Sequence, residues 1–204
     1  MTDSNRPTRP TREQIEALPA FEGLPLERIH LLQTPAQFDE ALQACRRERH
    51  IGFDTESKPT FTRDAVRSGP HVVQFALRDR AFIVQVGDAT PLEFLKTVIE
   101  STDMIKVGFG LVSDRGLLRG KLGIELGAIV ELSQALRVLR YKEDLGVKAA
   151  VAVVLGQRMS KSRSVTTSNW AVPDLKPAQL LYAANDAYAA LAVFHAMGLA
   201  EPAA

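Results

Sequence analysis

The sequence predicts a single α/β domain in which a mixed β-sheet is flanked by α-helices. Three features of the chain lead to this prediction. Strand-like runs dominate between about residues 51 and 86, strands and helices then alternate to about residue 132, and the remainder is helical. This order is typical of a mixed sheet covered by helices. The length of 204 residues fits one domain with a substantial buried core.

The first elements are an edge strand and a well-capped helix. Residues 28–32 are expected to form the strand. Thr34 then suits the helix N-cap, Pro35 suits the first helical position, and Gln37 completes a capping box. The helix that begins here is expected to run to about residue 47.

Three strand-like runs follow, at residues 51–56, 71–77 and 81–86. The second and third are joined by Arg78-Asp79-Arg80, which indicates a β-hairpin. A loop with several basic residues, 57–70, separates the first run from the hairpin.

The next elements alternate before the chain becomes helical. Apolar residues at positions 92, 95, 98 and 99 recur with helical spacing, and a strand is expected after them. A helix that carries Asp114 follows a glycine-containing turn. The remaining expected elements, in chain order, are a strand at 129–132 and helices at 133–140, 147–155 and 177–197.

Composition narrows the class of protein. The net charge is only +1, so binding to nucleic acid would need a local basic patch. Cys45 is the single cysteine, which excludes an intrachain disulfide and a zinc site made of cysteines. No apolar run is long enough to span a bilayer and the N-terminus is polar, so a cytoplasmic location is expected. Residues 1–12 are expected to form a flexible tail and residues 13–204 the domain.

Four acidic residues and one tyrosine carry the strongest chemical signal. Asp54 and Glu56 are two apart on a predicted strand, so their side chains project from one face, while Tyr182 and Asp186 lie one helical turn apart. Asp114 opens another predicted helix. Close carboxylates repel one another unless divalent cations lie among them, and oxygen ligands suit Mg²⁺ or Mn²⁺. The pattern therefore predicts a site for two divalent ions, which commonly drive displacement at phosphorus.

The order of these residues resembles that of a known superfamily. Four segments are similar, in order, to the successive motifs of the DEDD 3′–5′ exonucleases: IGFDTES, HVVQFAL, IKVGFGLVSDRGLL and LLYAANDAYAALAVF. The closest resemblance is to the branch of RNase D and the Werner-syndrome helicase exonuclease domain. Tyr182, four residues before Asp186, identifies the tyrosine (DEDDy) type. The resemblance implies a ribonuclease H-like fold and a free 3′ end of nucleic acid as the partner, with DNA favoured over RNA.

The resemblance also implies a division of labour among the five residues. Asp54 would bridge both metal ions, and Glu56 and Asp186 would complete the site of the ion that activates the attacking water. Asp114 would hold the second ion, which stabilises the leaving 3′ oxygen, and Tyr182 would orient the water. The products would be nucleoside 5′-monophosphates.

Substrate contacts are predicted from two basic loops and from residues beside the acids. The loop after the first acidic pair has Ser57-Lys58-Pro59 where Werner-type domains often place an aromatic residue, so Phe61 is a possible replacement. A second basic loop spans residues 157–164. The candidates are Thr55, Lys58, Phe61, Arg63, Phe109, Arg158, Lys161 and Arg163. The alternative is that these charges are simply solvated loops, and Trp170 is interpreted as a packing residue.

Two other functions fit parts of the pattern. A nucleic-acid-binding module of the same fold that has lost catalysis would bind without turnover. A metal-free hydrolase with two carboxylates, such as a glycosidase, would keep its activity in EDTA. The presence of all four acids and the tyrosine favours the metal-dependent nuclease over both. No membrane contact and no nucleotide cofactor are expected, and the oligomeric state is left open.

Overall fold

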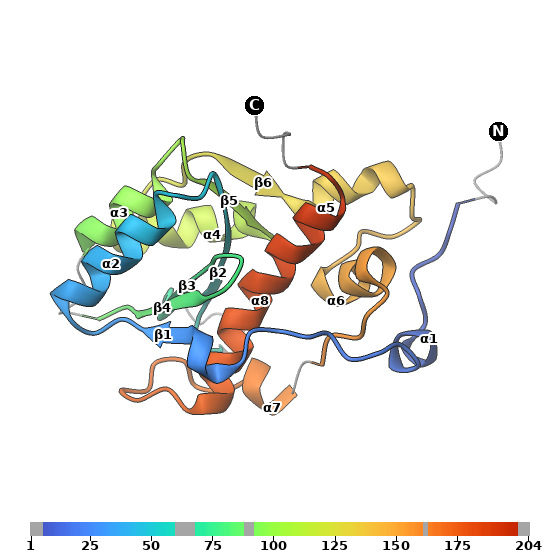
Figure 1. The fold of residues 1–204 in the computed structure, drawn as a ribbon, viewed down its shortest axis with the longest axis horizontal. Helices are drawn as coiled ribbons and strands as arrows, with labels where there is room; N and C mark the ends of the chain where they lie inside the picture. The colour runs from blue at the N-terminus through green and yellow to red at the C-terminus, as the bar shows by residue number, and fades with distance from the viewer. Residues whose placement is uncertain (1–5, 60–67, 88–91, 161–162, 200–204) are drawn as a thin grey trace.

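The computed structural model describes residues 6–59, 68–87, 92–160 and 163–199. These residues form a six-stranded sheet with the order β1-β4-β3-β2-β5-β6 and with helices on both faces, as Figure 1 shows. The predicted α/β class is therefore confirmed. The strands are β1 (Ile29–Leu31), β2 (His50–Glu56), β3 (Val72–Ala76), β4 (Ala81–Gln85), β5 (Ile105–Gly108) and β6 (Ile129–Glu131).

The sheet is mixed in direction. β2, β3 and β4 are antiparallel neighbours, which confirms the hairpin between β3 and β4. The pairs β1–β4, β2–β5 and β5–β6 are parallel. β2 lies between β3 and β5. The strand that carries Asp54 and Glu56 is therefore inside the sheet, with a neighbour on each side.

The helices are α1 (Arg12–Glu16), α2 (Pro35–Cys45), α3 (Leu92–Ile99), α4 (Leu111–Leu117), α5 (Leu132–Ala135), α6 (Val147–Ala150), α7 (Arg163–Thr166) and α8 (Pro177–Ala196). The predicted capping box of α2 is present, because Thr34 Oγ1 accepts from the Gln37 backbone N–H and Gln37 Oε1 accepts from the Thr34 backbone N–H. The sequence did not predict α1 or α7. None of the described helices combines the length and the apolar character needed to cross a bilayer.

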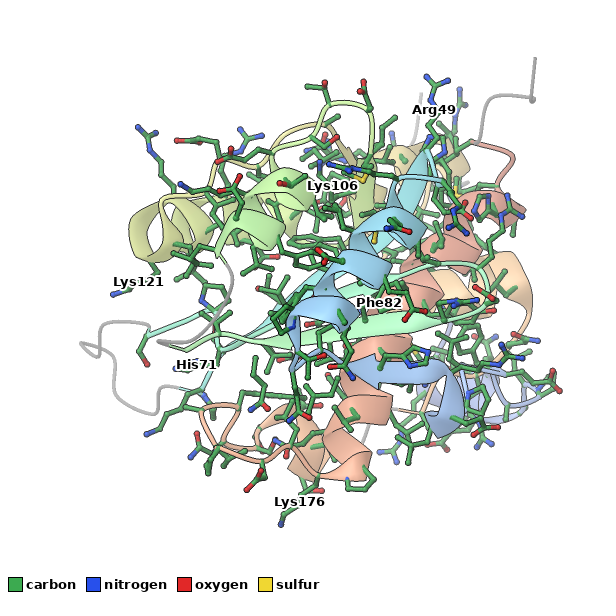
Figure 2. The ribbon with its side chains drawn as sticks, turned by 60° about the vertical axis from the view of Figure 1, so that its left-hand side comes forward. Arg49, His71, Phe82, Lys106, Lys121 and Lys176 are labelled. Carbon is green, nitrogen blue, oxygen red and sulfur yellow. The ribbon has the colours of Figure 1, made fainter. Side chains whose placement is uncertain are left out.

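One face of the sheet packs against α2 and α3. Phe53 and Phe75 are paired across β2 and β3, and their ring centroids are 5.6 Å apart. Phe94 of α3 packs edge-on against Phe75, and Phe38 of α2 packs edge-on against Phe94. Lys106 is buried and its β5 position pairs with Ile51, whereas Lys121 projects from the surface (Figure 2).

The other face packs against the alanine-rich helix α8. Ala183 and Ala187 belong to the apolar cluster that includes Val72 and Ala76 of β3. A methyl group at Gly52 of β2 would collide with the backbone oxygen of Ala187. The glycine therefore lets α8 lie close against β2, and this contact places the C-terminal helix beside the acidic end of that strand.

An N-terminal segment runs across this helix. The Phe21 backbone N–H donates to the Arg158 oxygen at 3.0 Å, and the Arg158 N–H donates to the Pro19 oxygen at 2.7 Å. The Asn185 side chain of α8 pairs with both backbone groups of Leu24, at 2.6 and 3.2 Å. Figure 1 shows the segment passing α8 on its way from α1 to β1.

Candidate metal-binding active site

Three carboxylates meet where β2 ends beside α8. Asp54 and Glu56 project from the same face of β2, and Asp186 reaches them from α8. Each offers an oxygen that lies within 4.8 Å of the others. Asp54 and Glu56 are half-buried and Asp186 is only 5% exposed, so water screens their mutual repulsion poorly.

This donor set fits a divalent cation. Carboxylate oxygens are the ligands that Mg²⁺ and Mn²⁺ prefer, and a cation among them removes the repulsion that otherwise opposes their approach. The convergence of Asp54, Glu56 and Asp186, from segments far apart in the chain, agrees with the predicted metal site.

Asp114 lies outside this group of mutually close carboxylates. It is half-buried in the first turns of α4, and its Oδ1 accepts a hydrogen bond from Thr55 Oγ1 at 3.2 Å. The Thr55 backbone N–H in turn donates to Asp54 Oδ1 at 2.9 Å. Thr55, predicted as a substrate contact, therefore links the fourth acid to the group of three.

Glu131, which sequence reasoning missed, holds the turn before α4. Its Oε1 accepts from the Gly110 backbone N–H at 3.1 Å and from the N–H and hydroxyl of Ser133 at 3.2 and 2.7 Å. Gly110 has a φ of 76°, the left-handed conformation that favours glycine. The turn between β5 and the helix of Asp114 is thus fixed from β6. The only signal in the sequence was an acid at the end of a short apolar run.

Tyr182 is held by its neighbours on one side of α8. Thr166 Oγ1 donates to the Tyr182 hydroxyl oxygen at 3.2 Å, so α7 positions the phenol. The Trp170 and Tyr182 rings have centroids 5.9 Å apart, and Trp170 is 1% exposed. The interpretation of Trp170 as a packing residue is confirmed.

Gln74 is the second residue that sequence reasoning missed. It lies directly opposite Asp54 on β3 and is fully buried on the face that α8 covers. Neither its amide nitrogen nor its oxygen has a hydrogen-bond partner among the described residues. An unpaired amide of this kind costs stability, so such groups are rare and their positions are informative. The signal was a polar residue inside the apolar run of β3.

The other predicted substrate contacts are spread around the site. Lys58 is exposed, with its backbone N–H donating to His71 Nδ1 at 3.1 Å, and Phe109 is half-buried against the apolar cluster that α8 shares with α5 and α6. Phe61, Arg63 and Lys161 lie outside the described residues, and of Arg163 only the backbone, which begins α7, is described.

Arg158 shares a cavity with two of the catalytic candidates. It lines a cavity of about 310 Å³ together with Tyr182, Asp186, Asn185 and Phe21. The cavity is partly open to solvent. The Nε atom of Arg158 is buried without a hydrogen-bond partner among the described residues.

The family model for 3′–5′ exonucleases matches residues 29–200. The chain belongs to this family. The mouse bifunctional 3′–5′ exonuclease/ATP-dependent helicase WRN is 30% identical over 151 residues, which cover 72% of this chain and 11% of that protein. The exonuclease mut-7 homolog of Aedes aegypti is 27% identical over 193 residues, or 83% of this chain and 26% of that protein. The chain thus spans a minor part of these relatives.

Solved structures establish the fold independently. The Nibbler EXO domain of Aedes aegypti superposes with a TM-score of 0.74 at 23% identity, covering 88% of this chain and 92% of that one. RNase D of Escherichia coli superposes with a TM-score of 0.71 at 16% identity, covering 84% of this chain and 44% of that one. The predicted ribonuclease H-like fold and the resemblance to the RNase D and Werner-type branch are confirmed.

Proposed function

We propose that this exonuclease removes nucleotides one at a time from the 3′ end of single-stranded nucleic acid and releases nucleoside 5′-monophosphates. The observation that carries the proposal is the convergence of Asp54, Glu56 and Asp186 within 4.8 Å beside Tyr182. A two-carboxylate hydrolase needs only an acid and a second carboxylate, and a third buried carboxylate would add repulsion without a role.

Asp54, Glu56 and Asp186 would hold divalent cations, with Asp114 supporting a second ion from α4. Such cations, when bound, acidify water and neutralise the charge that develops on phosphate and leaving oxygens. Thr55 keeps Asp54 and Asp114 in a fixed relation through its two hydrogen bonds. The acidic residues therefore act as a framework whose geometry is set before substrate arrives.

Tyr182 would orient the attacking water. Its hydroxyl is held by Thr166 and its ring by Trp170, so the phenol has a defined position one turn from Asp186. A phenol ordinarily loses its proton near pH 10, which makes it a poor base at neutral pH. We therefore assign to Tyr182 a hydrogen bond to the water rather than removal of its proton.

The proposed substrate is a single-stranded polynucleotide, which can be DNA or RNA. The resemblance found in the sequence favours DNA. A solved structure of Trypanosoma brucei RNase D in complex with RNA U12 has the same fold, with a TM-score of 0.70. This similarity supports RNA as a substrate as well. The assay below includes both polymers for this reason.

The test uses 5′-labelled single-stranded DNA and RNA of one sequence with Mg²⁺, Mn²⁺ or EDTA. The wild type is expected to give a metal-dependent ladder that shortens from the 3′ end, and Asp54→Asn is expected to lower the rate by at least about a hundredfold. Cleavage that persists in EDTA would support the metal-free hydrolase. Binding of both polymers without cleavage in any metal would support the silent binding module.

A further inference from the structure

The N-terminal segment forms part of the wall of the site. The family match begins at residue 29. The cavity beside Tyr182 and Asp186 is nevertheless lined on one side by Ala20, Phe21 and Gly23. Residues that precede the family match therefore face the space next to the proposed catalytic pair.

This cavity adjoins a larger one of about 700 Å³. The two share Arg158, Met159 and Ser160 as lining residues, so they are neighbours along the 158–160 segment. The larger cavity extends under α1, where Arg9 and Arg12 line it. The smaller cavity is thus the one beside Asp186, and the larger one is its neighbour beside α1.

The lining of the larger cavity is strongly basic. Arg9, Arg12, Lys148 and Arg158 contribute cations, and Glu16 is the one acid among its described lining residues. Arg12 Nε and Glu16 Oε1 form an exposed ion pair at 2.7 Å. Because the whole chain has a net charge of only +1, this is a local concentration of positive charge. Arg158 lines both cavities, and a guanidinium group can donate to phosphate oxygens.

The segment is anchored on both sides of this cavity. The Arg9 backbone N–H donates to Glu143 Oε2 at 3.1 Å, and the Lys142 N–H donates to the Pro7 oxygen at 3.1 Å. At the other side, Phe21 is bound to Arg158 through backbone hydrogen bonding. The wall is thus present in the free protein, which lowers the cost of ordering it on binding.

We propose that residues 9–23, with Lys148 and Arg158, form the path of the substrate strand on the 5′ side of the bond that is cut. The assignment of this path to the 5′ side of the strand rests on the proposed function, in which cleavage starts at the 3′ end. A released mononucleotide would need only the smaller cavity, whereas the neighbouring cavity of about 700 Å³ offers further space lined by cations. The chemistry that fits it is a phosphodiester backbone, with the nucleoside next to the cut in the smaller cavity.

The first test measures binding without cleavage. Fluorescence anisotropy in EDTA follows a 5′-labelled single strand of about 12 nucleotides as the salt concentration is varied. The combined variant Arg9→Ala, Arg12→Ala, Lys148→Ala is expected to bind at least about tenfold more weakly. The slope of its log affinity against log salt concentration should be smaller in magnitude by about 2. Each phosphate contact that is lost on a single strand lowers the magnitude of this slope by about 0.7, and three contacts are removed.

A matched variant controls for the loss of charge. The control variant also removes three cations, at the end of β2 opposite to the acids, through Arg46→Ala, Arg47→Ala and Arg49→Ala (Arg49 is labelled in Figure 2). None of these residues lines either cavity. This control is expected to keep the wild-type affinity within about twofold. Equal losses in the two variants would overturn the proposal.

Cleavage provides a second, separate readout. The ratio of kcat/KM for the long strand to that for a dinucleotide is expected to fall about tenfold in the Arg9/Arg12/Lys148 variant, because a dinucleotide does not reach the larger cavity. An unchanged ratio would overturn the proposal. A wild type that binds the strand with the predicted salt dependence but cleaves nothing would overturn the proposed function and leave the binding path supported.

Discussion

At the scale of single residues, the site is a balance between repulsion and positioning. Asp54, Glu56 and Asp186 are brought within 4.8 Å although like charges in partial burial oppose each other. Thr55 links Asp54 to Asp114 through two hydrogen bonds. Glu131 fixes the turn before α4 by accepting a hydrogen bond from the Gly110 N–H. Such sites commonly sacrifice stability for function.

Removing one charge from this group is expected to separate stability from activity. Asp186→Asn keeps the shape of a side chain that is 5% exposed, and in EDTA it should raise the free energy of unfolding by about 1 kcal/mol. The same change should abolish nuclease activity and the stabilisation that Mg²⁺ is expected to give the wild type through ligand linkage. Urea unfolding with and without Mg²⁺ measures both effects.

The exposed Asp174 provides the control for that experiment. Asp174→Asn also removes one negative charge but lies outside the acidic group. It should leave stability within about 0.5 kcal/mol of wild type and keep the Mg²⁺ effect. If Asp186→Asn instead lowered stability in EDTA, repulsion would not dominate at this group.

At the scale of elements, the contact between β2 and α8 assembles the site. Gly52 permits that contact, because the backbone oxygen of Ala187 occupies the place of a side chain. Asp54 and Glu56 follow Gly52 on the same face of β2, and Asp186 precedes Ala187 on the helix. The separation of strand and helix therefore decides whether the three carboxylates meet.

Gly52→Ala should push α8 away from β2. We expect a loss of about 1–3 kcal/mol in unfolding free energy, as is usual for overpacking, and a lower kcat because Tyr182 and Asp186 move with the helix. Gly116→Ala is the matched control, since a methyl group there meets nothing within 4 Å and alanine favours the helix α4. Urea unfolding of both variants should show shifts of opposite sign; a neutral Gly52→Ala would refute the close-contact argument.

At the scale of the whole molecule, charge is distributed unevenly although the total is small. The chain has 25 Lys and Arg against 24 Asp and Glu, yet acids gather at β2 and α8 while cations line the cavity under α1. Lys106 is the exception that is placed inside, where its Nζ donates to the Ser101 and Met104 oxygens at 2.5 and 2.8 Å.

Lys106 should make the stability of the whole domain depend on alkaline pH. Burial lowers the pKa of its ammonium from about 10.5 to about 8, so between these values the unfolded chain holds a proton that the folded chain has lost. The contribution of Lys106 to stability should therefore rise with pH in this window, by roughly 1–2 kcal/mol from pH 8 to 9.5. Lys106→Met should remove that rise. Urea unfolding at several pH values measures this rise. If the unfolding free energies of the wild type and of Lys106→Met changed in parallel with pH, the lowered pKa of Lys106 would be contradicted.

Much of the fold was predictable from local pattern. The capping box at Thr34 identified α2, alternation identified β2, and the hairpin signal between residues 77 and 81 identified β3 and β4. The five proposed catalytic residues were recognised by their order along the chain. Spacing of two on a strand and of four on a helix already places Asp54 with Glu56 and Tyr182 with Asp186 on shared faces.

Only the tertiary structure decided which of these faces meet. It brought Asp186 to the β2 acids and left Asp114 linked through Thr55, a difference that no local spacing contains. It also placed the buried Gln74 opposite Asp54 and tied Leu24 to Asn185 across 161 residues. Sequence by itself predicted most of the element types, which depend on neighbouring residues, and the order of its motifs identified the family. Convergence and the N-terminal wall depend on packing between distant segments, which the local pattern does not encode.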